Sequence, residues 1–433
     1  MHLKLGEVSH IIVSSPEIAK EIMKTHDTIF SNRPQTLASK IAYNGEDIAF
    51  SPYGDYWRQL RKMCTEELLS SKRVQSFRSI REEEVSAFIE TISSSKGLVV
   101  NLSEKIYSLT YGIIARAAIG EKSMAQQELI SIIEEGIHLA GELCIADLFP
   151  SITLLQMCSG VKAKSEKLFR KIDEILDRII KEHKKKKSSH MCEADKKYLV
   201  DFLLHFQQQN MEQQNLEHPL TDDNVKAVIM DVFSAGTETS SAVVEWAMSE
   251  MVKNPRVMEE AQAEVRRVFD CKGHVDESDM DQLIYLKSVI KETMRLHPPT
   301  PLLLPRESKE KCEINGYDVA ARTRVLINAW AIGRDAKYWT EANTFKPERF
   351  LGSSIDYKGT NFEFIPFGAG RRMCPGIAFA IADIELPLAQ LLYHFDWKLP
   401  DGTKHEELDM SESYGLTAKR QNGLSLIPII HHP

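Results

Sequence analysis

The chain has 433 residues, which is long enough for a large hydrophobic core and, by length alone, for two or three domains. Its formal net charge of −8 argues against nucleic acid as the main partner, and its composition, 43% hydrophobic and 27% charged, is ordinary for a globular protein. Seven cysteines, an odd number without a C-x-x-C spacing, disfavour a zinc site or a disulfide framework and indicate a reducing compartment.

The N-terminal segment predicts a β-hairpin. Leu3-Lys4-Leu5 and residues 8–13 flank Gly6-Glu7, as expected for two strands joined by a tight turn. Ser15-Pro16-Glu17 then begins a helix that runs towards Lys24, with proline in its first turn. The sequence contains no run of 18 apolar residues and no signal peptide, so it predicts no transmembrane helix.

Most of the remaining chain predicts helices. Short β patterns occur in 312–328 and again near 396–430, so the expected class is mainly α with a small β part. The lysine run at 184–187 is expected to be the solvated end of a helix, and 207–214 a polar surface loop. The amphipathic stretches that predict helices are 55–69, 76–92, 101–119, 124–143, 162–187, 222–252, 255–269 and 281–296.

The predicted helix 222–252 carries small and oxygen-bearing residues in its middle. Ala235 and Gly236 remove bulk from one face, which allows a flat ligand to approach the backbone. Glu238 beside Thr239 places an acid next to an alcohol, a combination that can deliver protons to a buried oxygen species. Helix packing, and hydroxyls that bond back to their own backbone, explain the same residues without a ligand.

Glu292 and Arg295 share one face of a predicted helix and can form an ion pair. Such a pair contributes less than about 1 kcal/mol when it is exposed. Leu296-His297-Pro298-Pro299 follows at once, and Phe345-Lys346-Pro347-Glu348-Arg349-Phe350 comes fifty-odd residues later.

The most informative segment, Phe367 to Gly376, sets one cysteine among three glycines. Glycine lets the backbone turn tightly and expose amide N–H groups, which can hydrogen-bond a thiolate and keep Cys374 deprotonated. Arg372 adds a positive charge that can hold the sulfur as an anion or pair with a carboxylate of a cofactor. A helical pattern begins at Ile377, so the sulfur lies where a helix N-terminus favours negative charge. The pattern predicts one soft, anionic metal ligand; a glycine-rich turn around a buried structural cysteine is the alternative.

This segment resembles the haem-binding loop of the cytochrome P450 family of haem-thiolate monooxygenases, whose pattern is F-x-x-G-x-R-x-C-x-G. The five specified positions are filled by Phe367, Gly370, Arg372, Cys374 and Gly376. The resemblance implies the cytochrome P450 fold, mainly α with a small β subdomain, as a single catalytic domain over residues 1–433. It also implies haem b, iron protoporphyrin IX, with Cys374 as the metal ligand.

Two further segments resemble family motifs that contact oxygen or haem. Residues 235–240 match the oxygen-activation pattern A/G-G-x-D/E-T-T/S, which implies that Thr239 stabilises iron-bound peroxide and that Glu238 is the acid of a proton relay. Trp57 and Arg61 lie one helical turn apart and match the W-x-x-x-R clamp of the haem propionates. The residues implied to contact haem are Trp57, Arg61, Ala235, Gly236, Arg306, Pro366, Phe367, Gly368, Arg372, Cys374 and Gly376.

The same resemblance gives Glu292 and Arg295 a structural role. In the family the corresponding residues form a buried triad with the arginine of P-E-R-F, here Arg349. A buried triad fixes geometry more than it adds stability, so we expect it to support the cysteine loop and not to take part in catalysis.

The chain as a whole resembles plant microsomal members of the family, which carry a membrane anchor, a proline-rich hinge and a first helix before the hairpin. These parts are missing from the sequence, so the chain resembles an N-terminally truncated member. We expect the full-length family member at the cytosolic face of the endoplasmic reticulum membrane, and this anchorless chain to be soluble or peripheral. Residues 148–155 form an apolar stretch that either touches a membrane or belongs to the core.

The resemblance implies a monooxygenase that inserts one oxygen atom of O₂ into an apolar plant specialised metabolite. Two electrons would come from NADPH through NADPH-cytochrome P450 reductase. By analogy with the family, terpenoids come first among the substrates and phenylpropanoids second. The hydrophobic substrate would lie against 36–50, 235–236, 300–304 and 414–417. The protein is expected to be a monomer whose basic, reductase-facing residues are Arg58, Lys62, Lys72 and Arg73.

Two other functions fit parts of the sequence. A haem-thiolate isomerase or lyase would rearrange a hydroperoxide without O₂ or reductase, but such an enzyme needs no proton relay, so Glu238-Thr239 counts against it. A truncated, non-catalytic product would bind haem poorly or not at all, because the strand Leu3–Val13 would keep an exposed edge. The haem content of the purified chain, and turnover of a fatty-acid hydroperoxide without NADPH, separate these alternatives.

Overall fold

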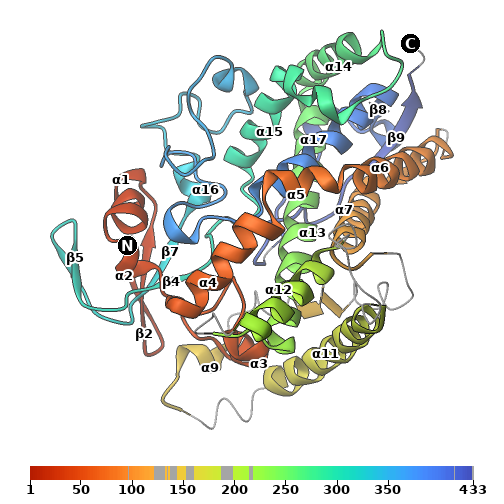
Figure 1. The fold of residues 1–433 in the computed structure, drawn as a ribbon. Helices are drawn as coiled ribbons and strands as arrows, with labels where there is room; N and C mark the ends of the chain where they lie inside the picture. Colours follow the sequence, from red (N-terminus) through yellow and green to blue (C-terminus); the bar gives the residue numbers. More distant parts are fainter. Residues whose placement is uncertain are drawn as a thin grey trace.

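The computed structural model describes residues 1–95, 97–120, 132–133, 135–136, 144–152, 160–186, 198–213, 218–413 and 415–431. Helices form the body of the molecule, and the strands gather into small sheets towards its margins (Figure 1). The predicted class, mainly α with a small β subdomain, is confirmed.

The helices follow the amphipathic stretches of the sequence, because apolar residues at three- and four-residue spacing give each helix a stripe to bury. Two of them continue into short π-helical turns, Glu21–Thr25 after α1 and Cys64–Leu68 after α4. The α-helices of the described residues are α1 Pro16–Lys20, α2 Asp27–Phe30, α3 Leu37–Ile41, α4 Asp55–Met63, α5 Ser71–Ser76, α6 Arg78–Ser93, α7 Leu102–Ile119, α9 Ile145–Leu148, α11 Gly160–Lys186, α12 Leu199–Gln213, α13 Asp222–Lys253, α14 Pro255–Phe269, α15 Ile284–Leu296, α16 Ala329–Ile332 and α17 Ile377–His394.

The predicted N-terminal hairpin becomes part of a sheet with a late segment of the chain. β1 and β2 pair antiparallel, and β2 pairs in parallel with β7, where His10 lies opposite Arg324. The sheet order is β1-β2-β7-β4, so β1 forms one edge; a second sheet has the order β3-β9-β8, and β5 pairs with β6. The strands are β1 His2–Leu5, β2 Val8–Val13, β3 Val100–Asn101, β4 Arg306–Glu307, β5 Cys312–Ile314, β6 Tyr317–Val319, β7 Arg324–Ile327, β8 Phe395–Lys398 and β9 Ser425–Ile430.

The long helix α13 runs through the middle of the molecule (Figure 1). A capping box closes its first turn, because the Thr221 hydroxyl accepts from the Asn224 N–H at 3.2 Å and the Asn224 side chain accepts from the Thr221 N–H at 2.9 Å. All residues from Ser240 to Val252 are buried, since α13 packs against α7, α15 and α17. The ends of α13 are thus fixed, and its middle is positioned inside the fold.

Among the described residues, α17 is the one helix that is long and apolar enough to cross a membrane by length and composition. Within the structure 56% of that stretch is buried, and α17 packs against α6, α13 and α14. Buried helices of a protein core pass the same test, so the finding gives no membrane assignment.

One expectation about the polar stretches is wrong. Residues 207–213 continue α12 and do not form a loop. Gln207 is buried there, and its carboxamide donates to Leu220 O at 3.1 Å and to Asp222 at 2.9 Å, which satisfies the polar group. The predicted helix 124–143 lies outside the described residues except for 132–133 and 135–136.

Candidate active site

The segment Phe367 to Gly376 forms a closed loop that leads into α17. The Cys374 N–H donates to Phe367 O at 2.9 Å and closes the loop. Gly370 has a φ of +71°, and a Cβ at this position would lie 2.1 Å from Met23 O, so only glycine fits. The backbone therefore holds Cys374 at a fixed place at the entry to α17.

Cys374 is a free and partly buried thiol. Burial raises its pKa, while the Gly376 N–H, which donates to the sulfur, and the charge of Arg61 act in the opposite direction. In the protein alone burial outweighs these two effects, and the charge that acts on the thiol comes from Arg61. A bound metal cation would supply the positive charge that a thiolate needs.

The middle of α13 is open on one side, although the helix is otherwise buried. Ala235 is exposed and Thr239 is partly exposed, whereas the stretch from Ser240 to Val252 is buried. Gly236 also faces α7, since a Cβ there would lie 2.6 Å from Ile114 Cδ1. The open surface for a flat ligand thus lies at Ala235, and Gly236 serves the contact between α13 and α7.

Glu238 and Thr239 are neighbours in sequence but have different partners. The Thr239 hydroxyl donates to Ala235 O at 2.6 Å and so bonds back to its own helix. Glu238 is buried; its carboxylate accepts a hydrogen bond from the Thr417 hydroxyl at 3.0 Å and forms an ion pair with Lys419 at 2.5 Å. The sequence analysis assigned no role to Thr417 or Lys419 as partners of this acid.

Trp57 and Arg61 lie one turn apart on α4, and both donate to main-chain carbonyls. The Trp57 indole N–H donates to Ile48 O at 3.0 Å, and Arg61 donates to Met373 O at 2.5 Å. The guanidinium carbon of Arg372 lies 4.0 Å from the centre of the Trp57 ring, a cation–π contact. The structure therefore brings three predicted site residues together between α4 and the cysteine loop.

Arg33 is a buried residue of this region that the sequence analysis missed. Its guanidinium donates to Ala49 O at 2.9 Å, to Leu304 O at 2.8 Å and to Pro305 O at 2.7 Å. It thereby joins the segment before α4 to the segment before β4. No local pattern could have revealed it, because all three acceptors are main-chain carbonyls of other segments.

Positive charge exceeds negative charge among these buried groups. Burial, and then repulsion by Arg306 and Arg61, lower the pKa of Arg372 to about 9. Burial and the charges of Arg372 and Arg306 lower the pKa of Arg33 in the same direction. The set comprises four arginines, Arg33, Arg61, Arg306 and Arg372, and two aspartates, Asp27 and Asp47, with a third aspartate, Asp231, beside Asp47. The excess of positive charge suits anionic partners such as the propionates of haem.

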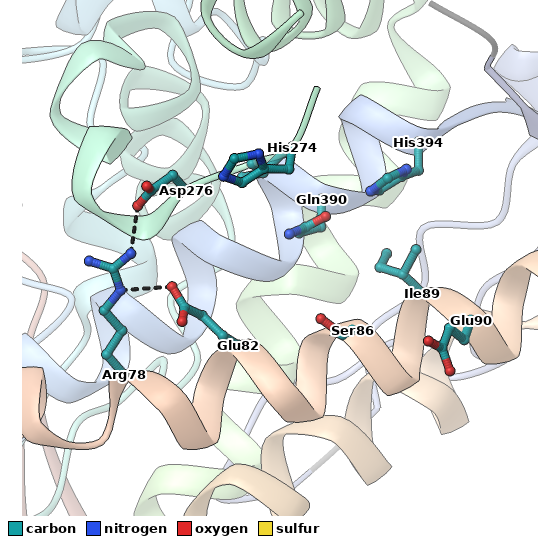
Figure 2. A pocket seen from close by; sticks show the side chains of 10 residues that line it. Arg78, Glu82, Ser86, Ile89, Glu90, His274, Asp276, Gln390 and His394 are labelled. Carbon is teal, nitrogen blue, oxygen red and sulfur yellow. Dashed lines mark hydrogen bonds and ion pairs between the residues drawn. The ribbon is translucent and has the colours of Figure 1, made fainter. Parts of the chain in front are cut away.

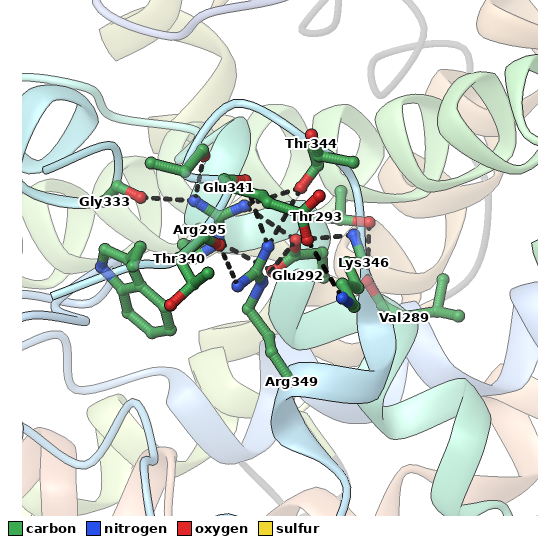
Figure 3. Close-up of polar contacts among 12 residues, drawn as sticks. Val289, Glu292, Thr293, Arg295, Gly333, Thr340, Glu341, Thr344, Lys346 and Arg349 are labelled. Atoms are coloured by element: carbon green, nitrogen blue, oxygen red, sulfur yellow. Dashed lines mark hydrogen bonds and ion pairs between the residues drawn. The ribbon is translucent and has the colours of Figure 1, made fainter. Parts of the chain in front are cut away.

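The charged triad predicted from α15 is present and buried (Figure 3). Arg295 donates two hydrogen bonds to the Glu292 carboxylate, each at 2.7 Å, and Arg349 donates a third at 2.9 Å. Arg295 also donates to Gly333 O at 2.6 Å and to Ala342 O at 2.7 Å. The triad thus fastens the segment after β7 to α15, which is a structural role.

A separate cavity of about 500 Å³ lies between α6, the end of α17 and the turn after α14 (Figure 2). Its lining mixes polar and apolar residues, and three of the charged ones are paired, since Arg78 bonds Glu82 at 2.7 Å and Asp276 at 2.6 Å. The cavity reaches His394 at the C-terminal end of α17, whereas Cys374 precedes the N-terminal end. No residue predicted to contact haem lines it, so this cavity is distinct from the cysteine site.

Comparison with known proteins places this geometry in a family. The family model Cytochrome P450 matches residues 1–425. The chain is 61% identical to cytochrome P450 71D10 of Glycine max, over 100% of this chain and 84% of that protein. It is 56% identical to tabersonine 6,7-epoxidase isoform 1 of Catharanthus roseus (100% and 85% covered) and 49% identical to premnaspirodiene oxygenase of Hyoscyamus muticus (100% and 86%). A zebrafish cytochrome P450 solved with progesterone has a TM-score of 0.84 at 24% identity, with 100% and 96% covered, which shows likeness of fold alone.

The cysteine loop and the helical fold define a haem-thiolate oxidoreductase. The chain belongs to the cytochrome P450 family. Haem b is the cofactor of this family, and monooxygenation is its reaction class. The predictions of family, fold class, cofactor and enzyme class are confirmed, and the roles of the individual site residues stay predictions.

Proposed function

We propose that the protein inserts one oxygen atom of O₂ into a hydrophobic plant specialised metabolite, with terpenoids as the first substrate class. Two electrons come from NADPH through NADPH-cytochrome P450 reductase. The observation that carries the proposal is Cys374, held in a closed glycine loop beside buried arginines that outnumber the neighbouring aspartates. An epoxidase and an oxygenase among the relatives support oxygen insertion as the reaction.

Each site residue has a part that its chemistry allows. Bound haem supplies an iron centre that activates O₂, and its thiolate ligand favours O–O cleavage. Cys374 would hold the iron, and the exposed face of Ala235 leaves room for the flat ring. The propionates would be bound by Trp57, Arg61, Arg306 and Arg372, and the remaining contacts would come from Gly236, Pro366, Phe367, Gly368 and Gly376.

Glu238 and Thr239 would manage protons at the open side of α13. The Thr239 hydroxyl is partly exposed there and can donate a hydrogen bond to the reacting oxygen. Glu238, the buried residue before it, would resupply the proton that the hydroxyl gives up, once its carboxylate has itself taken up a proton. General acid catalysis of this kind contributes about 10²- to 10⁴-fold to rates.

Apolar side chains beside the cysteine loop support a hydrophobic substrate. Leu303 is close to that loop, because a Cβ at Gly368 would lie 3.7 Å from Leu303 Cδ1. We propose that 36–50, 300–304 and 415–417 line the substrate pocket; Tyr414 lies outside the described residues. A premnaspirodiene oxygenase at 49% identity makes terpenoids the first compounds to test. Such a pocket separates molecules that differ by one methylene by only about 1–3 kcal/mol.

The reductase would bind a basic surface around α4 and α5. Arg58, Lys62 and Lys72 are exposed, whereas Arg73 packs over the Phe202 ring at 4.2 Å and is partly buried. The first three are therefore the stronger candidates, with charge attraction as the physical basis. If reversing these three charges leaves reductase-driven turnover unchanged, the reductase does not bind this surface.

We further propose a monomer of one catalytic domain, residues 1–433, at the cytosolic face of the endoplasmic reticulum membrane. Ile145, the first residue of α9, and Ile152, which follows the helix, are exposed and support contact of this segment with a membrane. Residues 153–155 of the predicted apolar stretch lie outside the described residues. Co-sedimentation of the chain with lipid vesicles tests the contact, and an unchanged distribution for Ile145→Asp would contradict it.

The test of the proposed function is the reduced carbon monoxide difference spectrum, followed by turnover. We expect a Soret band shifted far to the red, as a thiolate ligand gives, and its loss in Cys374→Ser. Terpenes with NADPH, O₂ and reductase should then yield oxygenated products. If a fatty-acid hydroperoxide is turned over without NADPH, and no terpene is oxygenated in its presence, a hydroperoxide isomerase or lyase would replace the proposal.

A further inference from the structure

Asp27 is a buried acid that holds the main chain of the cysteine loop. It is the first residue of α2, and its side chain is 4% exposed. Its Oδ2 accepts from the Arg371 backbone N–H at 2.9 Å and from the Arg371 guanidinium at 3.1 Å. Arg371 stands shortly before Cys374 in the loop, so this carboxylate fixes the backbone just ahead of the candidate iron ligand.

The other oxygen of Asp27 contacts an arginine that is expected to bind a haem propionate. Oδ1 accepts from Nη1 of Arg306 at 3.2 Å and from the Ser31 hydroxyl at 3.0 Å. Nη2 of Arg306 donates to Ala369 O, in the cysteine loop, at 2.9 Å. The carboxylate, the guanidinium and the loop thus form one set of contacts in which each member touches the other two.

Gly370 allows the carboxylate to lie this close to the loop. A Cβ at position 370 would lie 2.9 Å from each carboxylate oxygen of Asp27, in addition to its clash with Met23 O. Ser31 holds the acid from the side of α2, since its hydroxyl also donates to Asp27 O at 2.6 Å. The position of the carboxylate is therefore fixed both by the loop and by its own helix.

Arg306 keeps donors for a further anion. Its Nη1 donates to Asp27 and, at 3.5 Å, to Phe30 O, and one N–H of Nη2 donates to Ala369 O. Within the part of the chain that the structure describes, the Nε–H and the second N–H of Nη2 have no partner. Asp27 thus orients the guanidinium without occupying all of it, as outer partners do for the groups that bind a metal or cofactor.

The charge of Asp27 offsets part of the positive excess at this site. Burial lowers the pKa of Arg306, and the charge and the hydrogen bond of Asp27 act in the opposite direction. Charges interact more strongly where water is excluded, so a buried carboxylate acts on charged groups held nearby. A negative charge of this kind favours the oxidised, more positive form of a bound metal over the reduced form.

We propose that Asp27 is a positioning residue of the cofactor site, which holds Arg306 and the cysteine loop in one arrangement and lowers the reduction potential of the bound iron. The inference rests on the proposed function, because it concerns the cofactor of the same site. It gives a role to a residue that lies outside every motif of the sequence. Its effect is exerted through Arg306 and the loop, and Asp27 itself takes part in no chemical step.

Haem retention tests the positioning. Asp27→Asn keeps the shape of the side chain and loses its charge, whereas Asp27→Ala loses the contacts as well. We expect Asp27→Ala to transfer haem to apomyoglobin roughly tenfold faster or more, and part of its carbon monoxide band to move to the position of thiol-bound haem. Asp318→Asn, at an exposed aspartate of β6 that pairs with Lys311, is the matched control. A transfer rate and a band of Asp27→Ala equal to those of the control would overturn the inference.

The reduction potential of the haem-loaded chain tests the charge. Asp27→Asn should raise the potential, because the neighbouring arginines then lose an anion. Arg371→Met should lower it, because the Asp27 carboxylate then loses a counter-charge, and the double variant should lie between the two. The Arg371 side chain is 48% exposed, so its shift should be the smaller one. A general loosening of the loop would move both single variants in the same direction, so opposite signs identify the charge of Asp27 as the cause.

Two outcomes of this comparison contradict the inference and leave the proposed function standing: shifts of the same sign in both single variants, or a potential of Asp27→Asn equal to that of the wild type. If Asp27→Asn purifies without haem, Arg371→Met decides. A lower potential then supports the inference, and an unchanged or higher one contradicts it. Failure of the proposed function differs from all of these, because the wild type itself would lack the red-shifted carbon monoxide band.

Discussion

The guanidinium of Arg372 stacks on the indole of Trp57, with 4.0 Å between the guanidinium carbon and the ring centre. The two residues come from the cysteine loop and from α4, so this contact joins the candidate iron ligand to a helix that is distant in sequence. A buried cation–π contact is worth about 2 kcal/mol. It also places the only N–H of the indole towards Ile48 O, where it donates at 3.0 Å.

Variants of Trp57 should separate the stack from the hydrogen bond. Trp57→Phe keeps a ring under Arg372 and removes the N–H, so we expect a loss of about 1 kcal/mol in the free energy of unfolding. Trp57→Leu removes both and should cost about 2–4 kcal/mol. Urea unfolding gives these values, and the ratio of haem to protein after purification should fall in the same order. Equal losses for both variants would show that the stack adds nothing.

Gly370→Ala should destabilise the cysteine loop more than Gly368→Ala. Both glycines have a φ of +71°, so each alanine brings about 1–2 kcal/mol of backbone strain. Only at Gly370 would the Cβ also meet a backbone atom, Met23 O at 2.1 Å, whereas at Gly368 the nearest atom is 3.6 Å away. Thermal unfolding of the two variants provides the comparison. Similar midpoints would mean that the loop can move away from Met23.

Removing one member of the buried triad should lower the free energy of unfolding. Arg349→Met removes one hydrogen bond to the Glu292 carboxylate, which has zero exposure and keeps Arg295 as its counter-charge, and a hydrogen bond to a charged group contributes about 1.5–3 kcal/mol. The exposed pair Lys311–Asp318, 2.9 Å apart, is the control, and Lys311→Met should change stability by less than about 1 kcal/mol. Equal effects in urea unfolding would contradict the structural role of the triad.

Stability should fall as the pH rises through the range in which Glu385 titrates. Burial raises the pKa of Glu385 from 4.5 to about 7, opposed by the charge of Lys287 and aided by those of Asp281 and Glu277. The folded state thus binds more protons than the unfolded state between pH 4.5 and about 7. Over that range the contribution of Glu385 to the free energy of unfolding decreases as the pH rises. Above pH 7 this contribution is constant.

Glu385→Gln removes this pH dependence, so the free energy of unfolding is measured against pH for the variant and the wild type. The variant should exceed the wild type at pH 8 by about 1–3 kcal/mol in the free energy of unfolding and match it near pH 4.5. Glu406→Gln, at an exposed position, should leave the pH profile of the wild type unchanged. A Glu385→Gln profile parallel to that of the wild type would show that this carboxyl ionises normally.

The helices could largely be predicted because their signals are local. Thr221 caps α13 and Asn254-Pro255 ends it, as the capping and proline patterns indicate. The end of α12 was missed because its glutamines resemble a polar loop, although Gln207 is buried and bonded to Leu220 and Asp222. Burial of that side chain depends on the start of α13, which no window around residue 207 contains.

The candidate site could be predicted where its residues stand close together in sequence, as in the loop around Cys374. Arg33 and Lys419 could not, because their partners are carbonyls or a carboxylate that only folding brings near. The contact of Gly236 with Ile114 of α7 could not be predicted either, because it depends on how two helices pack. A motif names the residues of a site, and the packing around them decides what each one does.

The parallel pairing of β2 with β7 has a consequence during protein synthesis. Val8–Val13 is synthesised more than 300 residues before its neighbour Arg324–Ile327. Until then the early strand has an unsatisfied side that other nascent chains or chaperones can bind. Assembly of this sheet must therefore wait until the segment between the two strands has been made.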